Sequence, residues 1–235
     1  MKATQGGRSG RRRRINDPQG TRRDIVEVAT LEFAQKGYSG ARVDAIASRT
    51  RTSKRMIYYY FGSKEGLYLA VLDEAYSGIR RAEATLDLEK LAPEEALRTL
   101  VGFTFDYYNK HPEFVRLVMN ENIMDGAHMA RSKTISKLNV TVIDAMGRLI
   151  ARGQKERTFR RDIDPIELHM SISALGIFNV ANRATFSTIF RRDMTSPKAL
   201  AKRREEIVEI VLGHVLLPAR SAARCPRSGR RGHDS

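Results

Sequence analysis

Apolar residues recur every three or four positions along most of this chain, which is the spacing of one face of an α-helix. The stretch from Thr21 to Lys36 shows this spacing first, and Gly37 is well placed to end the helix because glycine readily adopts a positive φ. No stretch alternates apolar and polar residues between hairpin turns, so the sequence predicts no β-sheet. The pattern therefore indicates an all-α protein.

Two short helices are predicted next, over about residues 42–49 and 53–61, joined by a polar turn. Ser53 begins the second of them well, since its hydroxyl can accept a hydrogen bond from an otherwise unpaired N–H in the first turn. Ser63 can cap the following helix in the same way, and that helix extends to about Gly78 or slightly beyond. Helix, short turn and helix together form a helix-turn-helix.

Proline, acidic residues and glycine mark the ends of five further helices. These helices span about residues 93–109, 111–123, 127–152, 165–188 and 197–217, which makes nine in all. The predicted organisation is a flexible basic arm over 1–17, a three-helix head over 18–66, a six-helix body over 67–217 and a disordered basic tail over 218–235.

Charge is distributed unevenly along the 235 residues, whose formal net charge is +15. Residues 1–64 carry 15 Lys and Arg against 5 Asp and Glu, whereas residues 65–217 carry 22 against 21. Residues 218–235 add 5 basic residues and 1 acidic residue. A basic head on a nearly neutral body favours a polyanion partner for the head and a different partner for the body.

The helix-turn-helix supplies the chemistry that a DNA-binding surface needs, because the second helix of this motif enters the major groove. Lys54 and Arg55 can donate to guanine, Met56 and the tyrosines can contact thymine methyl groups, and Ser53 with its neighbouring backbone can hold a phosphate. Ile57, Tyr58 and Phe61 are expected to pack inward. The candidate DNA contacts are Arg42, Thr52, Ser53, Lys54, Arg55, Met56, Tyr59, Tyr60 and Lys64.

Other interpretations of these basic segments stay open. The hairpin could be an ordinary helical pair with a solvated basic face, and each Lys or Arg could touch phosphate instead of a base. The Arg11–Arg14 run could follow phosphates or enter the minor groove of the bound DNA, or it could be a solvated tail. The composition of the C-terminal basic run from Arg220 to Arg231 is typical of a disordered tail.

The head resembles the N-terminal signature of the TetR (tetracycline-repressor-like) family over about residues 21–72. The residues that carry the resemblance are Gly37-Tyr38, Val43, Ile46-Ala47, Ser53, Ile57-Tyr58, Tyr60-Phe61 and Ser63-Lys64-Glu65. The family often has a small residue and glycine in the turn, where this chain has Thr50-Arg51. It often has Thr or Ser before the second helix, where this chain has Ala41-Arg42, so Arg42 replaces a usual phosphate contact.

The resemblance implies a homodimer that binds a double-stranded DNA operator and is released by a small-molecule effector of unknown identity. The dimer would form through about 165–188 and 197–217, although the same apolar residues could be intramolecular core. Polar residues among apolar ones are candidate ligand contacts, each of which could equally be plain core or surface. The polar candidates are Tyr107, Asn122, His128, Asn179 and Arg183, and the candidate apolar walls are Phe103, Phe114, Met119, Met124 and Phe178.

No catalytic signature is present in the sequence: there is no phosphate-binding glycine loop, no zinc-binding histidine motif and no nucleophile motif. We therefore expect no enzyme activity, no cofactor and no metal site. The lone Cys225 excludes a disulfide framework, and the absence of a secretory signal or apolar span favours the cytoplasm and no membrane partner. The alternative function is a ligand-independent architectural DNA-binding protein, against which the near-neutral body argues.

Overall fold

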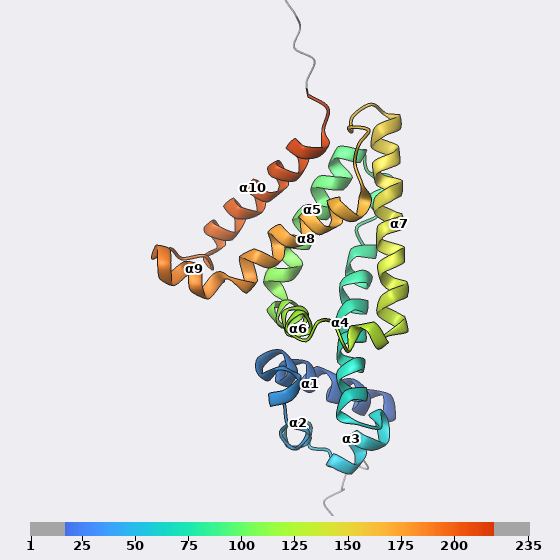
Figure 1. The fold of residues 1–235 in the computed structure, drawn as a ribbon, viewed down its shortest axis with the longest axis vertical. Helices are drawn as coiled ribbons and strands as arrows, with labels where there is room; N and C mark the ends of the chain where they lie inside the picture. The colour runs from blue at the N-terminus through green and yellow to red at the C-terminus, as the bar shows by residue number, and fades with distance from the viewer. Residues whose placement is uncertain (1–16, 219–235) are drawn as a thin grey trace, which may run out of the picture.

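The computed structural model describes residues 17–218, and over this range it contains ten α-helices, two short 3-10 helices and no β-strand (Figure 1). The single β-type pairing within the range is an isolated bridge between Phe159 and Leu216. The predicted all-α fold is confirmed. The Arg11–Arg14 run, Cys225 and the Arg220 to Arg231 run lie outside the described residues.

The head consists of α1 (Pro18–Gly40), α2 (Val43–Thr50) and α3 (Lys54–Phe61). Within α1, Gly37 adopts φ 68° and ψ 176°, so the regular helix is interrupted where the sequence predicts its end. The predicted caps are confirmed: Met56 N–H donates to Ser53 Oγ at 3.2 Å, and Gly66 N–H donates to Ser63 Oγ at 3.0 Å. Local side-chain chemistry therefore sets the start of both α3 and the helix after it.

Helix α4 (Lys64–Ala84) runs from the head up into the body, as Figure 1 shows. Its first half belongs to the core of the head, where Leu67, Tyr68 and Leu72 are fully buried against α1, α2 and α3. The same core includes Leu117 of α6 and Ile135 of α7. The boundary expected between residues 66 and 67 thus falls inside one continuous helix that both parts share.

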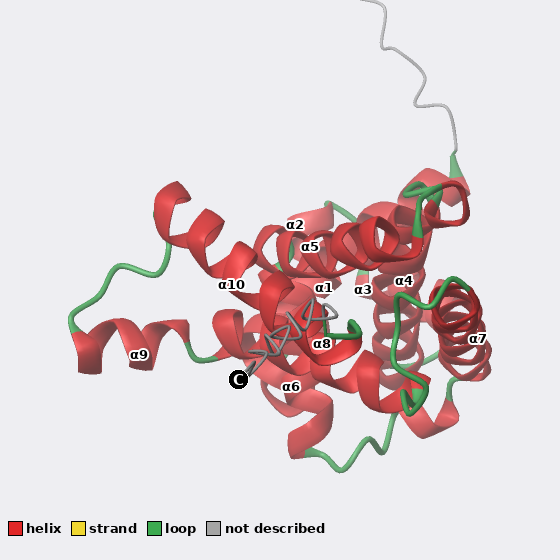
Figure 2. Cartoon of the chain, turned by 90° about the horizontal axis from the view of Figure 1, so that it is seen from above, coloured by secondary structure: helices red, strands yellow, loops and turns green. Residues whose placement is uncertain are grey.

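The body is formed by the second half of α4 and six further helices, separated by the short turns Leu88–Lys90 and Met129–Arg131. Its main apolar core packs α5, α7, α8 and α10 together around side chains such as Leu97, Ile172 and Val208. In Figure 2, α9 projects from the rest of the body. The six helices are α5 (Pro93–Lys110), α6 (Pro112–Ile123), α7 (Lys133–Lys155), α8 (Pro165–Ala181), α9 (Arg183–Phe190) and α10 (Pro197–Val215).

Two predicted helices differ from the observed ones. The helix predicted over 165–188 is two helices, because Asn182 leaves the helical conformation at φ −100° and ψ 4° and its side chain donates back to the Phe178 carbonyl. Asparagine competes with the backbone in this way and weakens helices. The helix predicted from Ala127 begins only at Lys133, because Met129–Arg131 form a 3-10 turn and Ser132 then caps α7 by accepting the Ile135 N–H at 3.0 Å.

Candidate nucleic-acid interface and ligand cavities

The turn between α2 and α3 is held by one residue in the left-handed region. Arg51 adopts φ 53° and ψ 30°, a conformation that costs an L-residue energy and suits glycine. The turn closes through a hydrogen bond from Thr52 N–H to the Ala47 carbonyl at 3.2 Å. The turn is therefore closed by a backbone hydrogen bond, although an arginine occupies the left-handed position.

Helix α3 has one buried face and one face open to solvent. Ile57 is fully buried in the core of the head, whereas Tyr59 on the opposite side is 77% exposed. Arg55 and Met56 are also exposed, and Tyr60 is half-buried against Tyr59 with ring centroids 5.4 Å apart. The inward packing predicted for Tyr58 is wrong, because its ring is 37% exposed; a one-residue step along a helix turns the side chain about 100° from Ile57.

Lys54 lies at the first position of α3 and points toward the preceding helix. Its Nζ is 3.1 Å from Asp44 Oδ1 of α2, and both side chains are about half exposed. An exposed ion pair of this kind contributes little to stability, so Lys54 can leave Asp44 for another partner at a small cost in free energy. Lys54 is thus held at the edge of the α3 surface by an exposed partner on α2.

Glu32 is a buried carboxylate that joins α1 to α2, and the sequence reasoning did not identify it. Its Oε1 lies 2.8 Å from Lys36 Nζ and accepts the backbone N–H of Arg42 at 3.3 Å, while Oε2 lies 3.8 Å from Arg49. Burial by itself would raise the pKa of Glu32, but the hydrogen bond and charge of Lys36, the Arg42 N–H and the Arg49 charge lower it below the ordinary value. The negative charge therefore fixes the start of α2, from which Arg42 projects to the surface.

Lys64 also has a structural partner within the head. Its Nζ donates to the Ser39 carbonyl at 3.3 Å and lies 5.0 Å from the centre of the Tyr38 ring. These contacts tie the start of α4 to the end of α1. A phosphate contact by Lys64 would be made from a side chain that is already oriented.

The head and the body are joined by a polar cluster around the loop between α6 and α7. Glu121 of α6 is 1% exposed and accepts the N–H groups of His128 and Met129 at 3.2 and 3.0 Å. His128 is buried and packs between the rings of Tyr38 and Tyr68, at 4.4 and 5.0 Å. A displacement in this loop would therefore be felt directly by α1 and α4 of the head.

The candidate ligand contacts lie at several separate places in the structure. Phe178 and Asn179 share a cavity, Tyr107 and Phe114 line a groove between the head and the body, and Phe103 packs beside Tyr107. The others lie apart, because residues spaced along separate helices face different neighbours. His128 is at the junction, Met119 and Asn122 are exposed on α6, Met124 lies in the following loop, and Arg183 donates to Asn109.

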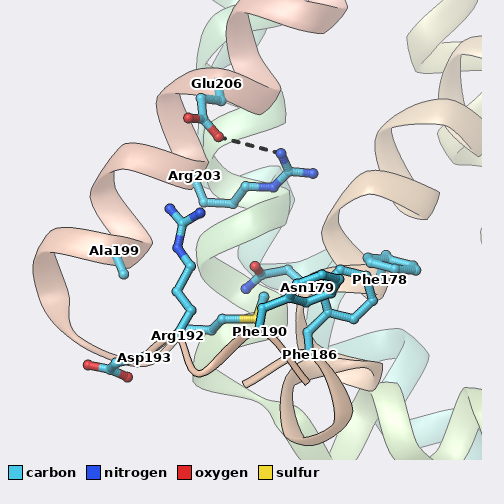
Figure 3. A pocket seen from close by; sticks show the side chains of 10 residues that line it. Phe178, Asn179, Phe186, Phe190, Arg192, Asp193, Ala199, Arg203 and Glu206 are labelled. Atoms are coloured by element: carbon cyan, nitrogen blue, oxygen red, sulfur yellow. Dashed lines mark hydrogen bonds and ion pairs between the residues drawn. The ribbon is translucent and has the colours of Figure 1, made fainter. Parts of the chain in front are cut away.

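Figure 3 shows the cavity that Phe178 and Asn179 share, a space of about 520 Å³ between α8, α9 and α10. Phe178 and Phe186 meet edge to face, and Phe186 lies 5.1 Å from Phe190. Arg192 extends from the loop after α9, whereas Arg203 extends from α10 and pairs with Glu206 at 3.5 Å. The cavity combines an aromatic wall with basic side chains at the outer edge of the body.

Two family models cover most of the described chain. Residues 25–71 match the bacterial regulatory proteins of the tetR family, and residues 93–211 match the tetracyclin repressor-like C-terminal domain. The chain belongs to the TetR family. It is therefore a DNA-binding transcription regulator of helix-turn-helix type, which confirms the resemblance in the head and extends it to the body.

Individual TetR-family relatives agree with this assignment. The transcriptional repressor NicS of Pseudomonas putida is 38% identical over 181 residues, covering 77% of this chain and 85% of NicS. The regulator RutR of Escherichia coli is 31% identical over 150 residues, covering 64% of this chain and 69% of RutR. The crystal structure of the regulator SCO4942 from Streptomyces coelicolor superposes with a TM-score of 0.64 at 26% identity, covering 83% of this chain and 98% of SCO4942.

Helix α8 of this TetR-family chain carries apolar side chains on two sides. One side packs against the other helices of the body, and the other side is exposed to solvent. Leu168 and Ile172 are buried against the body, whereas Ile166, Met170 and Phe178 are 58%, 55% and 44% exposed. Apolar side chains are exposed elsewhere on this edge of the body as well. They are Ile189 and Phe190 of α9 and Ile210 of α10.

No helix within residues 17–218 is both long enough and apolar enough to cross a membrane.

Proposed function

We propose that this TetR-family protein is a one-component repressor that binds a palindromic operator as a homodimer and leaves it when a small molecule binds the body. The observation that carries the proposal is the solvent-facing side of α3, where Lys54, Arg55, Met56 and Tyr59 are exposed above the buried Ile57. A short rigid helix with donors and apolar groups at its N-terminal end suits major-groove reading. The name of NicS as a repressor supports the same sign of regulation.

The proposal divides the DNA contacts of the head into base contacts and phosphate contacts. Lys54 and Arg55 are proposed to contact bases, with Met56 and Tyr59 beside them for thymine methyl groups. Flanking phosphate contacts are proposed for Arg42, Thr52, Ser53, Tyr60 and Lys64. The Glu32 contacts favour this arrangement, since they hold the start of α2 and hence Arg42 in place.

The homodimer is proposed to form through α8 and α10, with α9 at its edge. Exposed apolar side chains gather on this side of the body, and burying them between two copies would remove them from water. Two heads at a fixed spacing could then bind half-sites about one helical turn, roughly 34 Å, apart. The proposed dimer face includes the cavity of Figure 3, so a second copy would change the shape of that cavity.

The protein would have two conformations that differ in the position of the heads. Release of DNA requires that the effector binds these two conformations with different affinity. A release of about 100-fold corresponds to about 2.7 kcal/mol of coupling free energy. The contacts between Glu121, His128 and Tyr38 support a route for that coupling, because they join the body to the end of α1. Asn120 adds a second link by donating to the Phe33 carbonyl at 3.1 Å.

The decisive experiment compares binding of the purified protein to its own upstream intergenic DNA and to a scrambled duplex of equal length. The salt concentration should be held near ~150 mM, because electrostatic binding depends steeply on salt. A preference of about 10³-fold or more is expected for a specific repressor. Equal affinity for both duplexes, and for further intergenic fragments, would instead support an architectural DNA-binding protein.

The dimer face has its own test with a matched control. Met170→Asp places a charge on the exposed apolar side of α8 and should shift sedimentation toward the monomer and weaken operator binding. Val140→Asp makes the same change at a position of α7 that is 61% exposed, and it should leave the assembly unchanged. Equal effects of the two substitutions would contradict a dimer through α8.

A further inference from the structure

Three adjoining cavities in the body meet at Glu83 of α4. A cleft of about 450 Å³ lies between α4 and α7, and a second of about 460 Å³ continues along α7. Behind them is an inner void of about 10 Å³, lined from α4, α5, α7 and α8. Arg80 borders the first cleft and the void, whereas Glu83 borders all three spaces. Glu83 thus lies where the void adjoins the two outer clefts.

The guanidinium of Arg80 has more hydrogen-bond donors beside the void than there are acceptors to pair with them. Its Nη1 is 2.6 Å from Glu83 Oε2, and both side chains are less than one-fifth exposed. The Nε of Arg80 is buried without a hydrogen-bond partner among the described residues. The hydroxyl of Thr104, which also lines the void, already donates to the Leu100 carbonyl at 2.9 Å. A buried donor without an acceptor is rare in proteins and points to water or a ligand.

Three ionisable side chains, Arg80, Glu83 and His169, line the void, and the positive charge of Arg80 is the most favoured of their charges. Burial raises the pKa of Glu83, although the Arg80 charge opposes the shift. Burial and then the Arg80 charge lower the pKa of His169, which faces the same void from α8. The carboxylate is therefore poorly solvated and the imidazole is disfavoured as a cation. An added anion would compete with the Glu83 carboxylate for the positive charge of Arg80.

We propose that Arg80 binds the carboxylate of a small organic acid, which enters by the cleft between α4 and α7 and displaces Glu83. A guanidinium holds a carboxylate through two parallel N–H donors, and the unpartnered Nε makes one of these available. The void alone has room for about one water, so Glu83 must swing aside for the acid to enter. The apolar part of the acid would remain in the cleft against Leu138, Val142 and Ala145.

This site deepens the proposed function, on which its role as the effector site rests. Arg80 and Glu83 lie on α4, the same helix whose first half is buried in the core of the head. An acid that displaces Glu83 from Arg80 would alter the packing of α4 against α7. The cleft has the size of typical small-molecule sites, which range over about 300–1,000 Å³.

The test measures direct binding of simple carboxylates to the full-length protein by calorimetry. The probes are benzoate and the straight-chain acids from acetate to octanoate, each compared with its neutral amide. At least one acid should bind saturably, and its amide should bind at least about tenfold more weakly, because the charge-assisted hydrogen bonds are lost. Absence of saturable binding for the whole series would overturn the proposal.

Three substitutions make the assignment specific to Arg80. Arg80→Met should weaken acid binding by about tenfold or more, whereas Arg81→Met, at an exposed neighbour paired with Glu74, should leave it unchanged. Glu83→Gln should strengthen acid binding several-fold, since it removes the competing carboxylate while keeping the side chain's size. Equal affinities in Arg80→Met and Arg81→Met, or weaker binding in Glu83→Gln, would exclude the site. Should Arg80→Met fail to fold, Glu83→Gln and Arg80→Lys give the same decision.

Operator binding measured on the same samples separates this inference from the proposed function. Specific DNA binding without Arg80-dependent acid binding would overturn the carboxylate site and leave the repressor assignment standing. Arg80-dependent acid binding without any preferred DNA would do the reverse. Release of the operator by an acid that requires Arg80 would support both.

Discussion

The carboxylate of Glu121 holds the ring of His128 at the junction between head and body, with Oε1 3.0 Å from Nδ1. The pair is almost completely buried, with side-chain exposures of 1% for Glu121 and 9% for His128. Burial, and then the nearby Glu121 carboxylate, raise the pKa of Tyr68, whose ring packs against His128. One buried carboxylate therefore organises the loop after α6 against two aromatic rings of the head.

Glu121→Gln should lower the free energy of unfolding by about 1–3 kcal/mol, because an amide cannot accept all the N–H groups that the carboxylate accepts. It should also weaken the response of DNA binding to an effector, since the loop would no longer be fixed to the head. Glu113→Gln is the matched control, because Glu113 makes a similar contact to His111 at 3.0 Å but is partly exposed. Urea denaturation of the two variants compares them, and equal midpoints would contradict the role of burial.

Lys54→Ala should reduce discrimination between operator variants as well as affinity, by about 1–3 kcal/mol at the base pair that it contacts. Arg42→Ala should weaken binding to all sequences alike and reduce the salt dependence by about one counterion. Binding titrations over single-base operator variants at fixed salt distinguish these outcomes. A uniform loss in both variants would mean that Lys54 contacts phosphate.

Arg51→Gly should stabilise the head modestly, because glycine adopts the observed left-handed conformation without steric cost. The relief of about 1–2 kcal/mol is partly offset by the greater freedom of glycine in the unfolded chain, about 0.5–1 kcal/mol. Arg51→Val removes the same charge but should destabilise, since β-branched residues tolerate positive φ poorly. Thermal melting of both variants tests this, and a lower midpoint for Arg51→Gly than for Arg51→Val would refute it.

Glu32 should make the stability of the head depend on acid pH. Its pKa in the folded protein is lowered from the ordinary value of 4.5, so its stabilisation is complete above that pH and is lost as the pH falls further. Glu32→Gln should therefore cost about 1–3 kcal/mol near neutral pH and flatten the pH dependence below 4.5. Denaturation midpoints of both proteins across this pH range provide the measurement, and parallel curves would show that Glu32 is not responsible.

Local features of this protein could be predicted from the sequence because they depend on residues close together in the chain. Ser53, Ser63 and Asp164 each accept N–H groups two or three residues ahead, so their capping follows from short-range geometry. The 3.6-residue period likewise predicted the helices and the buried position of Ile57. The break at Asn182 was missed because apolar residues continue on both sides of it.

The buried charges could not be predicted in the same way. Glu32 and Glu121 look like ordinary surface acids in a helical pattern, and burial becomes visible only once α2 and the loop after α6 are packed against them. The candidate ligand residues lie apart for the same reason, since the packing of the helices and of the loop after α6 sets which neighbour each side chain faces. Arg80 and Glu83 went unnoticed because a pair three residues apart on a helix is usually solvated.

The sequence by itself determined the helical class, the helix-turn-helix and the basic character of the head, because periodicity, capping and charge act over a few residues. Only the tertiary structure decided which charges are buried, where the body is hollow and how the loop after α6 is joined to the head. Those features depend on contacts between residues such as Tyr38 and His128, which are far apart in the chain and come together only when the helices pack.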